Sequence, residues 1–85
     1  MKVCVVNHMG RGIEVHRVGC ADVERERRRR RLNSDWIADV PENMSVNEAI
    51  VRDLNDGFCW EPNSGEPAPW SENDVRVMPC VGSER

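Results

Sequence analysis

Alternation of apolar and polar residues at the start of the chain predicts a β-hairpin. Residues 2–7 are rich in β-branched side chains, and residues 13–18 alternate apolar and polar positions, beginning with Ile13 and Val15. The Met-Gly-Arg-Gly stretch between them carries two glycines, which suit the positive φ angles of a tight turn. Two such runs joined by a short glycine-containing turn are typical of a hairpin.

Helical spacing follows in two stretches. The first predicted helix begins around residues 19–21 and ends near Asn33, with acidic residues in its first turns and arginines in its last, the order that the helix dipole favours. In the second, Ser45 and Glu48 form a capping box, and Gly57 stands where a C-terminal cap is expected. Apolar residues recur at helical spacing in this second stretch: Val46, Ala49, Ile50 and Leu54.

Two further strands complete the pattern. Residues 36–40 form a short strand closed by Pro41, and residues 74–80 alternate as a final strand with a proline near its end. The Pro/Gly-rich residues 60–73 form a loop that is a candidate binding element. The order is ββαβαβ. We expect a single α+β domain over residues 1–85, with an antiparallel or mixed sheet of about four strands and both helices on one face.

Composition is typical of a folded soluble domain. The chain has 85 residues, of which 39% are hydrophobic and 32% charged. Its N-terminal apolar run is too short for a signal peptide, and no window approaches the ~20 apolar residues of a membrane span, so we expect a cytoplasmic protein with no membrane partner. The four cysteines are widely spaced and form no C-x-x-C pair, which excludes a zinc ribbon or thioredoxin-type motif and favours free thiols.

One group of residues carries candidate metal chemistry. His16 lies near the end of a predicted strand, Cys20 begins the first helix and Cys80 ends the last strand, so we expect Cys20 and Cys80 to lie close together with His16 beside them. Free cysteines are commonly buried as small apolar residues, and we favour that interpretation, which needs no cofactor. The alternatives are a disulfide and a zinc site, since imidazole and thiolate are ligands that zinc prefers. A zinc site would be completed by Cys59, Cys4 or His8.

The same residues bear on catalysis. A thiol at a helix start with an imidazole nearby is the pattern of a cysteine nucleophile and its base. The sequence offers neither a recognisable residue to orient His16 nor an oxyanion element. We therefore expect a protein that is not an enzyme.

Charge is concentrated in the first helix. The net charge of −3 disfavours general attraction to phosphate backbones, but six arginines fall within residues 25–31, interrupted only by Glu26. These arginines spread around the helix and several pair with acidic residues four positions earlier, so we expect a solvated face. The alternative is a clamp for phosphates or for an acidic partner surface. The uninterrupted block that would form it is Arg27, Arg28, Arg29, Arg30 and Arg31.

Tryptophans flank the Pro/Gly-rich loop. Trp60 and Trp70 stand at its two ends, and tryptophan is enriched both at interface centres and in the cores of small domains. Both roles stay open for these two residues, whereas Trp36 is expected in the core.

Residues 15–23, Val-His-Arg-Val-Gly-Cys-Ala-Asp-Val, are followed by a Trp-led strand, an acidic helix and a terminal Pro79-Cys80. This arrangement resembles small actinobacteriophage proteins that share a His-Arg-x-Gly-Cys-x-Asp string and carry no known activity. The resemblance implies a cytoplasmic setting in an infected host cell. We expect a small non-catalytic accessory protein that binds and modulates a host or phage protein. The alternatives are a nucleic-acid-binding accessory protein that uses the arginine-rich helix, and a metal- or thiol-bearing domain at His16, Cys20 and Cys80.

Overall fold

A hairpin lies at the centre of the sheet. The computed structural model describes residues 1–57, 61, 63 and 65–82. In it, β1 (Lys2–His8) and β2 (Gly12–Arg17) pair antiparallel, as predicted. Gly12 in the connecting turn has a φ angle of 77°, a conformation that favours glycine.

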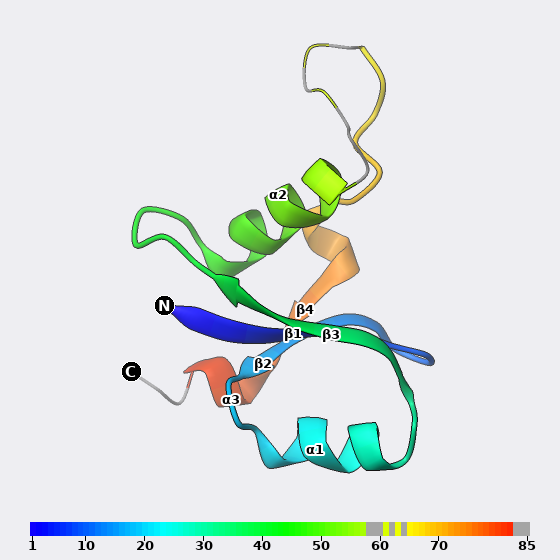
Figure 1. Ribbon diagram of the computed structural model, residues 1–85. Helices are drawn as coiled ribbons and strands as arrows, with labels where there is room; N and C mark the ends of the chain where they lie inside the picture. Colours follow the sequence, from blue (N-terminus) through cyan, green and yellow to red (C-terminus); the bar gives the residue numbers. More distant parts are fainter. Residues whose placement is uncertain (58–60, 62, 64, 83–85) are drawn as a thin grey trace.

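The two outer strands complete a mixed sheet with the order β3-β1-β2-β4 (Figure 1). β3 (Leu32–Asp39) pairs antiparallel with β1, and β4 (Val75–Val77) pairs parallel with β2. The predicted α+β class, the four-stranded sheet and the ββαβαβ order are confirmed.

The helices lie on opposite faces of this sheet, so the expectation that both cover one face is wrong. Figure 1 shows α1 (Ala21–Arg28) below the strands and α2 (Val46–Gly57) above them. Because both faces are covered, four consecutive residues of each central strand are buried. On the side of β2 that faces α1, the polar residues Glu14 and His16 give the sequence the pattern of a solvated face, but both residues are buried.

The main core lies between the sheet and α2. Ala49 and Ile50 of α2 belong to the same buried cluster as Val5 and Val15 of the central strands. Trp36 packs against this cluster and is partly buried. A second, smaller buried cluster lies on the α1 face and comprises Cys4, Val6, Cys20 and Val23, with Leu32 and Cys80 packed against it.

Helix α1 ends earlier than predicted. The N–H of Arg30 donates to the carbonyl of Arg27 and the N–H of Arg31 to that of Glu26, both at 3.1 Å, which is the Schellman arrangement. Arg30 takes the left-handed conformation, with φ of 55°, at the position usually held by glycine. The predicted end near Asn33 is therefore wrong, and β3 begins at Leu32 instead of Trp36.

The C-terminal part also differs from the prediction. β4 stops at Val77, and Pro79–Gly82 forms the short helix α3, so Cys80 belongs to a helix and does not end the last strand. Proline is well tolerated in the first turn of a helix because its missing N–H would have no partner there. A 3₁₀ turn, η1 (Glu72–Asp74), precedes β4.

Trp70 occupies a partly buried position against the main core. Its backbone N–H donates to Oδ1 of the buried Asn55 at 3.0 Å, and Nδ2 of Asn55 donates to the Trp70 carbonyl at 3.3 Å. These bonds tie the end of the loop to α2. The predictions for Cys59 and Trp60 lie outside the described residues. Among the helices that the structure describes, none has the length and apolar character needed to cross a membrane.

Candidate metal centre

His16, Cys20 and Cys80 come together from three different elements. His16 is near the end of β2, Cys20 precedes the first residue of α1 and Cys80 lies in α3. One donor atom from each residue lies within 4.8 Å of the donor atoms of the other two. The first two residues are buried and the third is partly exposed. The cluster therefore joins β2, α1 and α3 on the α1 side of the sheet.

Local backbone geometry brings Cys20 back toward the strand that carries His16. The N–H of Cys20 donates to the carbonyl of Arg17 at 3.0 Å, which closes a tight turn. Gly19 occupies the third position of this turn with φ of 83°, where a side chain would be strained. The turn explains why a thiol and an imidazole four residues apart can share a site.

Cys80 makes two polar contacts with β2. Its Sγ atom lies 3.7 Å from Nδ1 of His16, and the backbone N–H of Arg17 donates to the same sulfur with an N···S distance of 3.3 Å. Burial raises the pKa of the Cys80 thiol, the Arg17 N–H acts in the opposite direction, and the neighbouring Cys20 raises the pKa further. The net result is a raised pKa, so the uncomplexed thiol keeps its proton near neutral pH.

Glu14 contacts the other side of the imidazole. Its Oε1 atom lies 3.4 Å from Nε2 of His16, and only 1% of the Glu14 surface is exposed. A carboxylate only accepts hydrogen bonds, so this contact fits the His16 tautomer that carries its proton on Nε2 and presents the lone pair of Nδ1 to Cys80. The prediction missed this orienting residue. The available signal was the two-residue spacing of Glu14 and His16, which places both side chains on one face of a strand.

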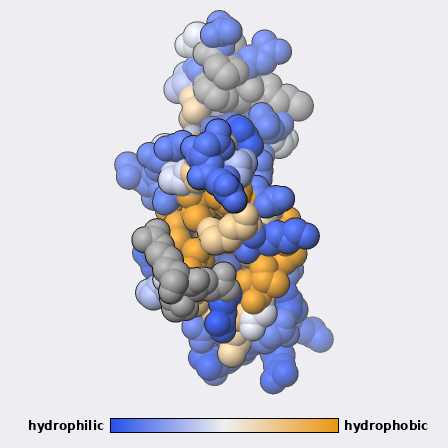
Figure 2. All heavy atoms as spheres, turned by 90° about the vertical axis from the view of Figure 1, so that its left-hand side faces the viewer, coloured by the Kyte–Doolittle hydropathy of each residue, from blue (hydrophilic) through white to orange (hydrophobic). Residues whose placement is uncertain are grey.

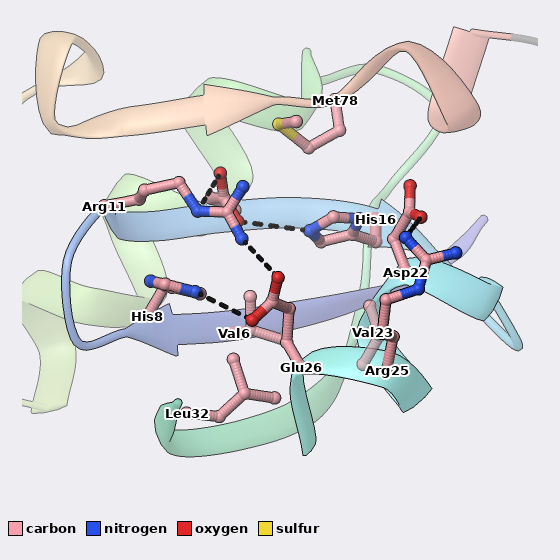
Figure 3. A pocket seen from close by; sticks show the side chains of 11 residues that line it. Val6, His8, Arg11, His16, Asp22, Val23, Arg25, Glu26, Leu32 and Met78 are labelled. Carbon is pink, nitrogen blue, oxygen red and sulfur yellow. Dashed lines mark hydrogen bonds and ion pairs between the residues drawn. The ribbon is translucent and has the colours of Figure 1, made fainter. Parts of the chain in front are cut away.

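A cavity of about 190 Å³ lies beside the cluster, between the hairpin and α1 (Figure 3). Glu26 points into it from α1, with Oε2 3.4 Å from Nε2 of His8 and Oε1 3.1 Å from Arg11. Burial raises the pKa of Glu26, but the hydrogen bond with His8 and the charges of Arg11 and Arg31 lower it more, so the net shift is downward. His8 also accepts the N–H of Gly10 on Nδ1 at 3.0 Å. Both ring nitrogens of His8 thus have partners away from the cluster.

Two members of the arginine block, Arg27 and Arg31, have acidic partners within the fold. Arg27 pairs with Glu24 and Asp35, and Arg31 lies 3.9 Å from Glu26. The other three residues of the block are exposed and form no ion pair with the described residues: Arg28, Arg29 and Arg30.

Apolar surface gathers elsewhere. Figure 2 shows apolar side chains in the middle of the face that carries the N-terminus. A groove of about 700 Å³ opens at the start of α2, and its apolar lining includes Val40, Pro41, Met44, Val77 and Val81.

Three kinds of chemistry fit the cluster: metal binding, disulfide formation and a thiol nucleophile with His16 as base. Donors in a tetrahedral zinc site lie about 3.5 to 4 Å apart, given zinc–sulfur bonds of about 2.3 Å and zinc–nitrogen bonds of about 2.0 Å. The Sγ atom of Cys80 and Nδ1 of His16 lie 3.7 Å apart, which is already within this range. A nucleophile with its base needs only one thiol and one imidazole, whereas two thiols and an imidazole converge here. The geometry therefore favours a metal over a nucleophile.

Comparison with known proteins adds no relative. The chain matches no family model, no curated protein and no solved structure.

Proposed function

We propose that this protein binds a thiophilic divalent metal ion, of which zinc is the natural example, through Nδ1 of His16 and the Sγ atoms of Cys20 and Cys80. The observation that carries the proposal is the convergence of these three donor atoms within 4.8 Å of one another. They come from three separate elements, so the spacing is a property of the tertiary fold. Two thiolates and an imidazole favour zinc over magnesium or calcium, which take oxygen ligands.

The surroundings of the donors support this proposal. Histidines that bind metals usually donate their second ring N–H to a carboxylate, which fixes the ring orientation and raises the basicity of the ligand. Glu14 stands in this position, 3.4 Å from Nε2 of His16. The Arg17 N–H that donates to Cys80 would stabilise a metal-bound thiolate in the same way.

A bound ion would act first as a cross-link. Among the residues that the structure describes, the buried apolar cluster on the α1 face contains four, and α3 (Pro79–Gly82) is four residues long. Elements with so little apolar contact gain much from a metal that joins them, since structural zinc supplies folding free energy directly. We therefore propose a structural metal centre that holds α1 and α3 against β2.

The first test is metal content and ligand identity. Untagged protein, purified under reducing conditions and loaded with zinc or Co²⁺, should retain one equivalent of ion after removal of the excess. The Co²⁺ form should show thiolate charge-transfer absorption and the visible bands of a tetrahedral site. Cys20→Ala and Cys80→Ala should each lower the charge-transfer intensity and weaken retention of the ion, whereas His8→Gln, a change at a buried histidine outside the cluster, should leave both unchanged. Failure of the wild-type protein to retain Co²⁺ or zinc would overturn the proposal.

The accessory role implied by the resemblance stays a prediction, with a host or phage protein as the expected partner. Nucleic-acid binding is favoured by the exposed Arg28, Arg29 and Arg30, and it predicts an affinity for DNA or RNA that falls steeply with salt. A metal-stabilised domain is compatible with either role.

A further inference from the structure

The cluster as it stands supplies three donors, whereas structural zinc sites have four. A three-donor site leaves one position for water or substrate and is the arrangement of catalytic centres. The identity of the fourth donor therefore decides what kind of centre this is. The sequence left Cys59, Cys4 and His8 open for that position.

The described structure distinguishes two of these candidates. His8 is hydrogen-bonded to Glu26 and to Gly10, and it lies four residues along β1 from Cys4, at the far end of the strand. Cys4 is the direct cross-strand partner of His16 in the register of β1 and β2. Side chains of directly opposed residues project from the same face of a sheet, with Cβ atoms about 4.5 to 5.5 Å apart.

Cys4 also belongs to the buried cluster on the side of the sheet where the centre lies. It is buried, and it shares one packed cluster with Cys20, against which Cys80 also packs. Its sulfur is not among the donors that lie within 4.8 Å of one another. A change between staggered χ1 rotamers moves a cysteine sulfur by about 3 Å, and the inference requires a rotation of this kind that brings the Cys4 sulfur to the other donors.

We infer that Cys4 is the fourth ligand and that the ion is held by three thiolates and one imidazole in a closed tetrahedral site. This inference rests on the proposed metal-binding function. It assigns the centre to the structural class, with no position left for substrate. Each ligand would then come from a different element: Cys4 from β1, His16 from β2, Cys20 from the start of α1 and Cys80 from α3.

The direct test uses the wild-type protein loaded with ¹¹³Cd²⁺. Proton–cadmium correlation spectra should show couplings from the metal to the β-protons of three cysteines, Cys4, Cys20 and Cys80, and to the ring of His16. Couplings to Cys20 and Cys80 without Cys4, or to Cys59 in its place, would overturn the inference and leave the proposed function standing. Absence of any bound cadmium would refute the proposed function itself.

A variant pair gives an independent readout in the Co²⁺ form. Cys4→Ala should reduce the thiolate charge-transfer intensity by about a third and weaken metal affinity by more than about tenfold, because one of three sulfur ligands is lost. The matched control is Val6→Ala, which truncates a buried residue of the same cluster two positions along β1 and should keep the wild-type spectrum. Identical spectra and affinities for the two variants would contradict the role of Cys4.

Discussion

The carboxylate of Glu14 lies 3.4 Å from Nε2 of His16, with both residues on the α1 face of β2 and both buried. The second oxygen of Glu14, Oε2, accepts no hydrogen bond from the described residues, and Nε of Arg11 lies 3.8 Å from it. The contact of Oε1 with His16 is therefore the closest polar contact of the Glu14 side chain. Burying a carboxylate costs free energy unless an opposite charge or a hydrogen-bond donor compensates it. An imidazolium or a metal-bound imidazole at His16 would provide this compensation.

Glu14→Gln should weaken metal binding while the fold is retained. The amide has nearly the same shape but no charge, so it orients the imidazole less strongly and lowers its basicity. Loss of such a partner typically costs about 10- to 100-fold in metal affinity. Competition with a chromophoric chelator measures the change, and Glu24→Gln on the exposed face of α1 is the matched control. Equal affinities for the two variants would show that Glu14 has no part in the centre.

Zinc should raise the thermal stability of the protein, and Cys20→Ser should remove this effect. Binding to the folded state alone stabilises it in proportion to the logarithm of ligand concentration over the dissociation constant. Differential scanning calorimetry with zinc and with a chelator measures the shift. Without metal, Cys20→Ser should still cost about 1–3 kcal/mol, because a hydroxyl replaces a buried thiol. The same zinc-dependent shift in wild type and Cys20→Ser would contradict metal binding at this position.

Arg30→Gly should stabilise the protein. Arg30 has φ of 55°, and this left-handed conformation costs an L-residue about 1 kcal/mol relative to glycine. Urea unfolding should show a gain of about that size. Arg28→Gly also removes an exposed arginine, but at the last residue of α1, and should lower stability by about 0.5–1 kcal/mol. A loss of stability in both variants would mean that the helix does not end as described.

The stability of the α1 face should decline in acid through Glu26. The hydrogen bond with His8 and the charges of Arg11 and Arg31 outweigh the effect of burial and lower the pKa of Glu26 in the folded protein. A group with a lowered folded pKa contributes stability above the ordinary carboxyl pKa and loses it as the pH falls through the folded value. Urea unfolding at several pH values should therefore show a shallower acid decline for Glu26→Gln than for wild type. Parallel pH profiles would count against this contribution.

Much of the fold could be predicted because its signals are local. The hairpin followed from alternation and a glycine turn, and α2 from its capping box, whose Ser45 hydroxyl does accept the N–H of Glu48 at 3.2 Å. The placement of the helices was missed because Glu14 and His16 are polar residues on a buried face, so that face lacked an apolar pattern. The end of α1 was missed because an arginine occupies the left-handed position where glycine is the usual signal.

The candidate site also contains residues whose positions could be predicted from the sequence and one residue that was missed. His16 and Cys20 share a strand-to-helix turn, so their proximity could be expected from spacing. The proximity of Cys80 was also expected, but from the wrong element: Cys80 lies in α3, which follows the parallel strand β4 and lies beside the end of β2. Glu14 was missed because its two-residue spacing from His16 places both side chains on one face of the strand but does not mark that face as buried.

The sequence separation of 64 residues between His16 and Cys80 determines when the centre can assemble. During synthesis, the hairpin and α1 are complete long before residue 80 leaves the ribosome, so the early chain carries the proposed ligands of β1, β2 and α1 without the one on α3. Closing so long a loop is slow relative to forming a hairpin or a helix. Metal uptake is therefore expected as a late step of folding, one that follows the docking of α3 and locks the last part of the chain onto the first.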